Sequence, residues 1–559
     1  MFNTNRPLDI AIIYNKSNHF GLEHDAELLK RSLFAKGTVR FVDPLEIPSP
    51  ADINIHLEVP IYSFVPWGTH NIFIMNPEWY VKAWDPYLKH FDAVITKEDL
   101  NLTNAYILPW SIIPFPKKEV TKVNEFLYLL GGSKNKRDFA KILLSLWKKS
   151  YPTLHVYSTE PVDFENGLEI AENVVLHVED LAKEKRETLL QTYNGHICCS
   201  MSEGFGYTAA EANYVGAFTI LNTLPVYNVY ADSPNVSYIK TNTAKTSEKY
   251  VNASFVEDIS LVDQGLIEAV EKFKTYTPVS TQVKDKFQKN LIEILERLPA
   301  KKKTTLPPIL ERKDCPPISV ITLLYNRKRF FELARHNMIL TDYPKDKIQW
   351  IIVDDSDNVE EQASDKIIQT IEQFTGMDIH YVPLQTKTPI SKKRNIGVEN
   401  CSNDIILFMD DDDHYPQTSF RRRVAWLTKH PMKVKATCCT TIACYDLLTG
   451  VSAVNCPPFD LPLGQRISEA TLTFYKLWFD VRPFDNDIQV GEGDSLVSGR
   501  EHEVLEIPPQ QILVAFSHGK NTSSRRIPAS ENVTPSCFWG FPKEYLTFIH
   551  QLAGVTVVT

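Results

Sequence analysis

The chain has 559 residues, which is too long for a single hydrophobic core and predicts about three or four domains. Its composition, 43% hydrophobic and 23% charged, is that of an ordinary globular protein, and its net charge of -9 argues against a nucleic-acid partner. Nine cysteines without a CxxC pair favour neither a zinc ribbon nor a disulfide framework. No window has the ~18 apolar residues of a membrane span and no signal peptide is recognised. We therefore expect no transmembrane segment and a cytoplasmic location, with peripheral membrane association left open.

Residues 1–115 are predicted to form a first Rossmann-like domain. Residues 8–14 have the continuous apolar pattern of a buried parallel strand, and a helical pattern follows them. Further strand-like runs, separated by helix-length intervals, lie at residues 39–42, 53–57, 71–75 and 92–96. Alternation of this kind predicts a parallel sheet covered by helices. Pro114 and Pro116 then indicate a crossing between domains.

Residues 116–297 are predicted to form a second α/β domain. Its first strand, residues 125–130, runs into a glycine pair that ends at Gly132 and then into a helix start with Lys134 and Arg137. Such a turn presents backbone N–H groups and cationic side chains to an anion at a helix N-terminus. Glycine also ends strands for reasons of turn geometry alone, so phosphate binding and a plain turn both remain open.

A glycine-bearing loop joins a short apolar strand to an alanine-rich helix within residues 196–212. Glu203 lies in the loop, and Glu211 lies inside the predicted helix. Gly204 and Gly206 let the backbone approach a ligand closely. The two carboxylates are suited to accept hydrogen bonds from sugar hydroxyls.

This Glu-x7-Glu pattern, with its Glu-Gly-Phe-Gly segment, resembles the donor-site motif of glycosyltransferase family 4. The resemblance covers roughly residues 8–295 and implies a GT-B fold, in which two Rossmann-like domains face each other across a cleft. It implies that Glu203 contacts the donor sugar, that Glu211 contacts the nucleotide ribose, and that basic residues neutralise the diphosphate without a metal. The donor-binding residues that it implies are Gly132, Lys134, Arg137, Glu203, Gly204, Phe205, Gly206 and Glu211.

Residues 298–315 are basic and proline-rich, which is typical of a semi-extended linker, and residues 316–559 are expected to form the C-terminal domain. In this domain a basic helix start at residue 391 accompanies apolar strands that end in polar or acidic residues. Those strands lie within residues 318–327, 349–357 and 404–413. Since the carboxyl ends of parallel strands meet at one edge of an α/β sheet, where ligands bind, the sequence predicts a nucleotide site there.

The acidic cluster Asp410–Asp413 directly follows a buried apolar strand. Four consecutive carboxylates raise one another's pKa unless a positive charge lies among them. Mn²⁺ and Mg²⁺ suit oxygen ligands, and Mg²⁺ is commonly held by one or two carboxylates plus substrate phosphates. A solvated acidic loop is the alternative interpretation. We expect Asp410 and Asp412 to face the metal, and Asp411 to point away along the alternation of the strand.

This ordered set resembles glycosyltransferase family 2, which has the GT-A fold, over roughly residues 316–530. The matching segments are a Thr-x-x-Tyr-Asn-Arg opening, a Val-Asp-Asp-Ser strand end, an Arg-Asn-x-Gly helix start and a DxD motif. The resemblance implies a nucleotide-diphosphate sugar donor, Mn²⁺ or Mg²⁺, and inversion at the anomeric carbon. It assigns the donor nucleotide to Thr322, Tyr325, Asn326, Asp354, Asp355, Arg394 and Asp411, and the metal to Asp410 and Asp412, with Asp413 beside them.

A general base is also expected, because family 2 carries a Glu-Asp pair whose Asp deprotonates the acceptor. In this sequence a glycine separates the two acids of a Gly-Glu-Gly-Asp segment, and we prefer Asp494 over Glu492 as the base. His518 is a candidate for a further metal or phosphate contact, with a surface-loop histidine as the alternative.

The sequence therefore predicts an α/β protein with a GT-B-like half of two Rossmann-like domains, followed by a GT-A domain. We expect it to move sugars from nucleotide-diphosphate donors to a glycan or glycoconjugate acceptor, with no cofactor in the N-terminal half. In one alternative only the C-terminal module is catalytic, and the N-terminal half binds an acceptor or partner. In another, the protein is a non-catalytic scaffold that binds nucleotides or sugars. A dinucleotide oxidoreductase is disfavoured because no GxGxxG follows the first strand.

Overall fold

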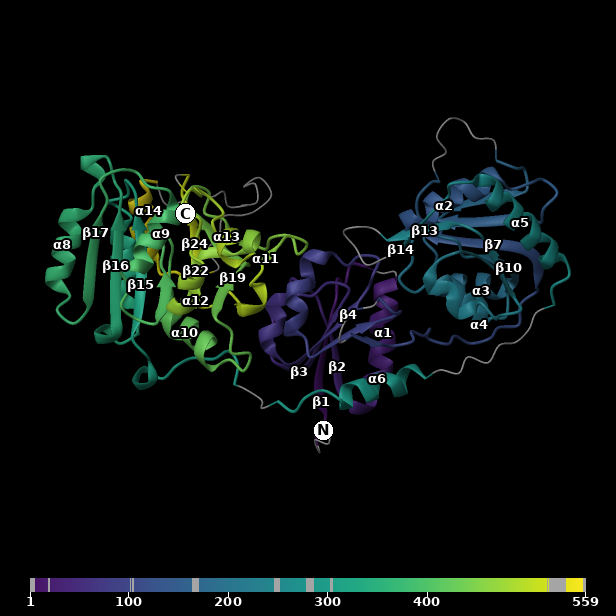
Figure 1. Cartoon of the computed structure of the whole chain (residues 1–559), viewed down its shortest axis with the longest axis horizontal. Coiled ribbons are helices and arrows are strands. Elements are labelled where there is room, and N and C mark those ends of the chain that lie inside the picture. The colour runs from purple at the N-terminus through teal and green to yellow at the C-terminus, as the bar shows by residue number, and fades with distance from the viewer. Residues whose placement is uncertain are drawn as a thin grey trace.

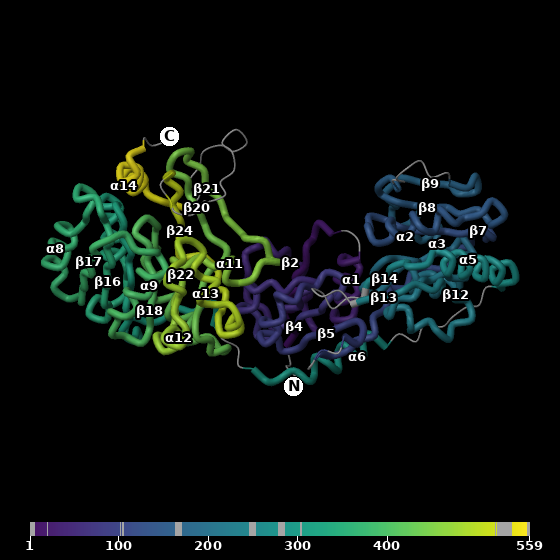
Figure 2. Tube along the Cα trace, turned by 45° about the horizontal axis from the view of Figure 1, so that its top comes forward, coloured from purple at the N-terminus to yellow at the C-terminus, as the bar shows by residue number. Residues whose placement is uncertain are grey.

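The computed structural model describes residues 6–18, 21–100, 102, 105–162, 170–245, 252–277, 286–301, 305–519, 521 and 539–555. Its elements gather into three bodies that follow one another in a row (Figure 1, Figure 2). The body that comes first in the sequence lies in the middle of the row, between the second body and the C-terminal body. Within the described ranges, every helix is too short or too polar to pass through a membrane.

The first body contains a six-stranded sheet with the order β2-β1-β3-β4-β5-β6. All neighbouring strands run parallel, as the alternating pattern predicts. The strands are β1 (Leu8–Ile13), β2 (Gly37–Val42), β3 (Ala51–Leu57), β4 (Gly68–Met75), β5 (Ala93–Thr96) and β6 (Ala105–Ile107). The helical elements between them are α1 (Gly21–Leu33) and the 3-10 helices η1 (Phe34–Lys36), η2 (Tyr62–Trp67) and η3 (Lys82–His90).

The helix α6 (Phe287–Glu296) returns to the first body after the chain has completed the second. Its residues Phe287 and Leu291 pack in one core with Ile10 of β1 and Leu29 of α1. The second body is therefore an insertion between β6 and α6, and α6, which lies within the domain expected at residues 116–297, packs with the first body. An amphipathic pattern predicts a helix but does not say which of two sheets the helix covers.

The second body contains another six-stranded parallel sheet, with the order β12-β11-β10-β7-β8-β9. Its strands are β7 (Val123–Gly131), β8 (Leu154–Ser158), β9 (Val174–Val178), β10 (Tyr193–Ile197), β11 (Phe218–Asn222) and β12 (Val236–Ile239). Its helices are α2 (Lys134–Ser145), α3 (Lys183–Thr192), α4 (Tyr207–Tyr214), α5 (Ile259–Lys274) and the 3-10 helix η4 (Pro225–Tyr230). A hairpin of β13 (Asn242–Lys245) and β14 (Asn252–Phe255) completes it.

The C-terminal body contains a mixed seven-stranded sheet with the order β17-β16-β15-β18-β22-β19-β23. The first four strands in this order are parallel, and β22 runs antiparallel to both of its neighbours. The strands are β15 (Ile318–Leu324), β16 (Ile348–Asp354), β17 (Asp378–Pro383), β18 (Ile405–Phe408), β19 (Ala436–Cys439), β22 (Ser468–Tyr475) and β23 (Val504–Glu506). Mixed sheets of this kind suit an α/β fold with an antiparallel extension.

A three-stranded sheet, ordered β21-β20-β24, lies beside the larger one. Its strands are β20 (Ile442–Asp446), β21 (Ser452–Asn455) and β24 (Val514–Ser517). The α-helices of the C-terminal body are α7 (Phe331–Leu340), α8 (Ser364–Gln373), α9 (Ile390–Glu399), α10 (Ser419–Lys429), α11 (Leu463–Arg466), α12 (Lys476–Val481), α13 (Gly493–Val497) and α14 (Lys543–Ala553). Its 3-10 helices are η5 (Arg312–Asp314), η6 (Lys345–Lys347), η7 (Val359–Glu361) and η8 (Glu501–Glu503).

The first body and the C-terminal body share one hydrophobic core. Trp84 and Tyr87 of η3 pack in the same cluster as Phe474 of β22. The Trp84 indole Nε1 donates a hydrogen bond to the Phe459 carbonyl at 3.0 Å. The two bodies therefore form one packed unit, a contact that the division into a separate GT-B half and GT-A domain does not anticipate.

Candidate active site

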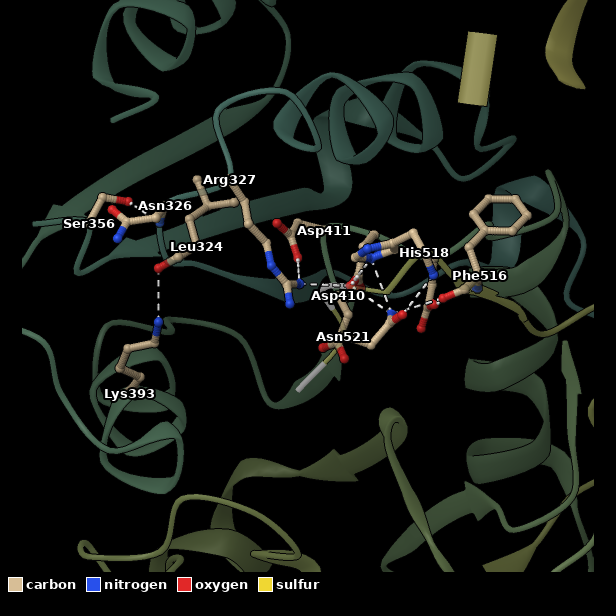
Figure 3. Close-up of polar contacts among 12 residues, drawn as sticks. Leu324, Asn326, Arg327, Ser356, Lys393, Asp410, Asp411, Phe516, His518 and Asn521 are labelled. Carbon is tan, nitrogen blue, oxygen red and sulfur yellow. Dashed lines mark hydrogen bonds and ion pairs between the residues drawn. The ribbon is translucent and has the colours of Figure 1, made fainter. Parts of the chain in front are cut away.

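Three parallel strands of the C-terminal body bring the predicted polar groups to one edge of the sheet. β15 lies between β16 and β18, so the loop after Leu324 is flanked by the loops after Asp354 and Phe408. Figure 3 shows Arg327, from the first of these loops, directed toward the acids that follow β18. The prediction that these strand ends share one edge is confirmed.

Arg327 supplies the positive charge that the acidic cluster needs. Its Nη1 lies 3.2 Å from Asp411 Oδ1 and 2.7 Å from Asp412 Oδ2. Burial and the neighbouring acids raise the pKa of Asp411 to about 7, while Arg327 acts in the opposite direction. The expectation that Asp411 points away is wrong, because β18 ends at Phe408 and strand alternation does not extend to the acids.

His518 reaches the same cluster from the loop after β24. Its Nε2 lies 3.0 Å from Asp412 Oδ2, and its ring packs against Phe330 with centroids 4.4 Å apart. Asn521 Nδ2 lies 3.4 Å from the same Asp412 oxygen and donates to the Phe516 carbonyl at 2.9 Å. His518 is therefore a buried residue of the site and not a surface-loop histidine.

The two outer acids of the cluster have different surroundings. Asp410 is the most exposed of the four, with 32% of its side chain accessible, and it lies 3.7 Å from Arg394. Asp413 is buried, and its Oδ1 accepts a hydrogen bond from the Phe516 N–H at 3.2 Å. The Asp413 carbonyl accepts another from Asn337 at 2.8 Å. Asp413 thus ties the acidic loop to β24 and α7.

The donor atoms of this cluster suit Mn²⁺ or Mg²⁺, since they are carboxylate oxygens and one imidazole nitrogen. In the part of the chain that the structure describes, no group of three or more His, Cys, Asp or Glu is arranged to hold a metal alone. Mg²⁺ is commonly held by one or two carboxylates and completes its shell with phosphates and water. Asp410 and Asp412 fit that smaller share of ligands.

Asp355, which follows β16, is held by a lysine that the sequence did not single out. Its Oδ1 accepts a hydrogen bond from Lys393 Nζ at 2.5 Å, and its Oδ2 accepts one from the Thr388 N–H at 2.8 Å. Lys393 also donates to the Leu324 carbonyl at 2.8 Å. This lysine therefore joins β15, β16 and α9. Several cations begin α9 in the sequence, and their order does not show which one turns inward. The adjacent Asp354 is buried as well.

Tyr325 and Asn326 lie in the loop after β15, beside Asp357. Asn326 Nδ2 donates to Asp357 Oδ1 at 2.7 Å, and the Tyr325 hydroxyl donates to Asp357 Oδ2 at 3.2 Å. Asn326 has a left-handed φ of 52°, and strain of this kind concentrates at binding sites. Thr322 is fully buried, and its Oγ1 accepts a hydrogen bond from Trp350 Nε1 at 3.0 Å. The Thr322 side chain thus belongs to the core, unlike the donor contact that the sequence predicts.

Arg394 connects the acidic cluster with the segment predicted to hold the base. Its Nε donates to Glu492 Oε1 at 2.7 Å, and its guanidinium lies over the Phe408 ring at 4.6 Å. Asp494 lies against Gly464 of α11, where a Cβ would stand 2.6 Å from Asp494 Oδ1. Residues two positions apart do not face each other on a helix, so only one of the two acids can lie beside Arg394. That acid is Glu492, and the preference for Asp494 over Glu492 as the base stays a prediction.

In the N-terminal half, the predicted donor loop faces the first body. Glu203 Oε1 lies 3.4 Å from Lys136 Nζ, at the start of α2. Phe205 packs against the core of the first body. Lys134 pairs with Asp138 at 2.5 Å, and 81% of its side chain is exposed. In this pair its ammonium group is directed at Asp138 and not at Glu203.

Three predicted glycines lie in the loops of this half. Gly132 is in the turn between β7 and α2, and Gly206, with φ of 79°, precedes α4. Gly204 lies so close to the first body that a Cβ there would stand 2.1 Å from Asn76 Oδ1. The glycine at residue 204 therefore permits contact between the two bodies. This contact is an alternative to the close approach of a ligand.

Two charged residues predicted to bind the donor are paired within the second body. Arg137 Nη2 lies 2.7 Å from Glu160 Oε2. Glu211 is buried in a two-point ion pair with Arg186 of α3, which joins Nη1 to Oε1 at 2.6 Å and Nη2 to Oε2. The ribose contact predicted for Glu211 would compete with this pair.

Glu211→Gln is expected to destabilise the second body by about 3 kcal/mol, because it leaves the Arg186 guanidinium without its counter-charge. Hydrogen exchange of the α3 and α4 amides in the full chain measures the loss of local stability. Glu179→Gln is the matched control, since it breaks an exposed pair with Lys185, worth at most about 1 kcal/mol. Equal effects of the two changes would contradict a structural role for the buried pair.

With this geometry described, the chain can be compared with known proteins. Residues 319–447 match the family model "Glycosyl transferase family 2". The predicted resemblance of the C-terminal body to glycosyltransferase family 2 is therefore confirmed over these residues. The matched segment contains β15, β16, β18 and the acidic cluster.

Curated relatives and solved structures cover parts of the chain. The poly(ribitol-phosphate) beta-N-acetylglucosaminyltransferase TarS of Staphylococcus aureus is 23% identical over 114 residues, which are 20% of this chain and 19% of the relative's length. The mannosyltransferase PcManGT from Pyrobaculum calidifontis, solved with GDP-Man and Mn²⁺, is 16% identical with a TM-score of 0.30, covering 38% of this chain and 60% of that one. A S. aureus TarS fragment with UDP-GlcNAc is 16% identical with a TM-score of 0.29, covering 38% and 61% respectively.

Proposed function

We propose that the C-terminal body transfers a sugar from a nucleotide-diphosphate donor to a hydroxyl group of a glycan acceptor, with inversion at the anomeric carbon. The observation that carries this proposal is the edge at the ends of β15, β16 and β18, inside the segment that matches family 2. There Arg327 meets Asp412 at 2.7 Å, and Lys393 meets Asp355 at 2.5 Å. Such an edge offers cations for a diphosphate and carboxylates for ribose hydroxyls.

Different side chains at this edge bind different parts of the donor. Asp355 and Asn326 accept and donate hydrogen bonds at the nucleoside, and Arg327 neutralises the diphosphate. Asp410 and Asp412 hold a divalent cation, which when bound stabilises the charge that develops on the leaving diphosphate. His518 keeps the Asp412 carboxylate in place through its 3.0 Å contact.

Release of nucleotide from a panel of UDP-, GDP- and TDP-sugars, with and without MnCl₂, tests this function in the full chain. UDP-GlcNAc belongs in the panel because TarS is an N-acetylglucosaminyltransferase. We expect metal-stimulated release from at least one donor. The scaffold alternative would replace this proposal if UDP bound with the same affinity with and without Mn²⁺ and no donor were turned over.

A second candidate function concerns the interface between the first two bodies. Glu58, after β3, has a left-handed φ of 67° and accepts a hydrogen bond from Asn76 at 2.9 Å. Glu78, after β4, accepts one from Asn135 at 2.6 Å. Burial, followed by the nearby Glu203, raises the pKa of Glu78 to about 7. Strained and desolvated carboxylates of this kind favour a site for a hydroxyl-rich ligand such as a sugar.

The interpretation of the N-terminal half as a metal-independent transferase therefore stays a proposal beside the alternative of an acceptor-binding module. Calorimetric titration of UDP-GlcNAc without metal, in an Asp412→Asn background, separates the two. Binding that disappears in Glu203→Gln but persists in Glu160→Gln supports a donor site in this half. Absence of nucleotide-sugar binding, combined with glycan binding that depends on Glu203, favours the acceptor-binding module.

A further inference from the structure

Glu469, at the start of β22, lies next to the segment predicted to hold the general base. Its Oε1 accepts a hydrogen bond from the Gly493 N–H at 3.0 Å. Glu492 precedes that glycine, and its charge acts on Glu469. The contact joins two segments that are far apart in the sequence, and no pattern around Glu469 marks it as a site residue.

The space beside Gly493 is already occupied. An added Cβ at Gly493 would stand 2.9 Å from Glu469 Oε1 and 2.4 Å from Ile467 Cδ1. Both distances are shorter than real Cβ contacts allow, so a side chain fits there only if its neighbours move. The glycine that separates Glu492 from Asp494 is therefore explained by a carboxylate that arrives from β22. Glu469 occupies the position where a side chain directly after Glu492 would begin.

Glu492 itself is paired with a cation. Its Oε1 takes the Arg394 Nε–H bond at 2.7 Å, and both side chains are 4% exposed. Arg394 Nη1, which makes no hydrogen bond within the described residues, lies 3.7 Å from Asp410 Oδ1. Arg394 thus links Glu492 to the acidic cluster.

Glu469 differs from Glu492 in its electrostatic environment. Burial and the charge of Glu492 raise the pKa of Glu469 to about 7, against the opposing effects of Arg394 and the backbone N–H groups of Glu469 and Gly493. Arg394 faces it from α9 and Gly493 from α13, and Cys438 of β19 is a further titratable group near it. A general base works best when its pKa lies near the operating pH.

We propose that Glu469 is the group that accepts the proton of the acceptor hydroxyl in the C-terminal site. This inference rests on the proposed transferase function. The acceptor O–H bond breaks and its proton passes to the Glu469 carboxylate, while the acceptor oxygen forms a bond to the anomeric carbon. The bond from that carbon to the diphosphate breaks, and the diphosphate leaves with the electron pair. Glu492 and Arg394 act as positioning residues that maintain the charge beside Glu469.

The test measures UDP release from UDP-GlcNAc by the full chain, with water as the acceptor, across a range of pH. In the wild type, activity is lost as the pH falls through about 7, because Glu469 becomes protonated. Glu469→Gln is expected to lower kcat by about 10²–10⁴-fold, to remove this acid limb, and to leave UDP affinity unchanged. Glu399→Gln, at the exposed end of α9, is the matched control and is expected to keep both kcat and the acid limb.

An acid limb that persists in Glu469→Gln would overturn the assignment while leaving the transferase function intact. Infrared difference spectra between the wild type and Glu469→Gln provide a second test, which does not depend on donor turnover. About one pH unit below the raised pKa, a protonated carboxyl band that Glu469→Gln removes is expected. Absence of this band would refute the assignment of Glu469 even if every donor proved inactive. Inactivity toward every donor, with the band present, would count only against the proposed function.

Discussion

Asp412→Asn is expected to lower donor turnover by about 10²–10³-fold, the usual effect of removing one preorganised charge from a transfer site. Asp412 Oδ2 is the point on which Arg327, His518 and Asn521 converge, at 2.7, 3.0 and 3.4 Å. The amide cannot hold a divalent cation as a carboxylate does, and its nitrogen opposes the Arg327 donor. UDP affinity in the presence of Mn²⁺ is expected to fall about 10–100-fold. Turnover kinetics and calorimetry measure the two effects.

Asp378→Asn is the matched control for this change. Asp378 lies at the start of β17 and pairs with His380 at the surface, so turnover and UDP affinity should remain at the wild-type level. Thermal unfolding checks that Asp412→Asn leaves the fold intact, since Asp411 still balances Arg327 at 3.2 Å. Metal-dependent UDP binding of wild-type strength in Asp412→Asn would refute the metal assignment.

The site at the ends of β15, β16 and β18 could be predicted from the sequence, because the signals that indicate it lie within short segments. A buried apolar run followed by acids marks the carboxyl end of a strand, and parallel strands bring such ends together. The Asp354 and Phe408 strand ends meet on either side of β15 for this reason. The same reasoning identifies the polar residues at the strand ends but does not show where their side chains point. From this reasoning we expected Thr322 to contact the donor and Asp411 to point away. In the structure Thr322 is in the core and Asp411 pairs with Arg327.

The partners of the site residues could not be predicted, because they come from distant segments. The Gly493 contact of Glu469 depends on how β22 approaches α13, and the Arg186 pair of Glu211 depends on how α3 approaches α4. Neither pairing leaves a periodic signal in the sequence. The return of α6 to the first body has the same origin, since its apolar face suits either sheet. Long-range packing therefore decides which of several plausible acids becomes a base or a structural ion.

The shared core of the first and C-terminal bodies leads to the largest stability effect that we expect. Trp84→Ala should reduce the free energy of unfolding by about 3–5 kcal/mol, the usual cost of truncating a buried Trp. Trp84 is 3% exposed, packs edge-on against Tyr80 at 5.4 Å, and donates its indole N–H to the Phe459 carbonyl. The change leaves a cavity in this core and an unpaired carbonyl at its margin. Urea unfolding of the full chain, followed by near-UV circular dichroism, measures the loss.

Trp79→Ala is the control for the loss of an indole, because Trp79 is 54% exposed, and its effect should stay within about 1 kcal/mol. The shared core also predicts that residues 316–559 expressed alone will aggregate, since Phe474 and its neighbours lose the apolar cover of Trp84 and Tyr87. If that fragment were monomeric and as stable as the intact chain, the two bodies would not be one folding unit. Activities of the two halves are therefore better separated by point substitutions in the full chain than by cutting it at residues 298–315.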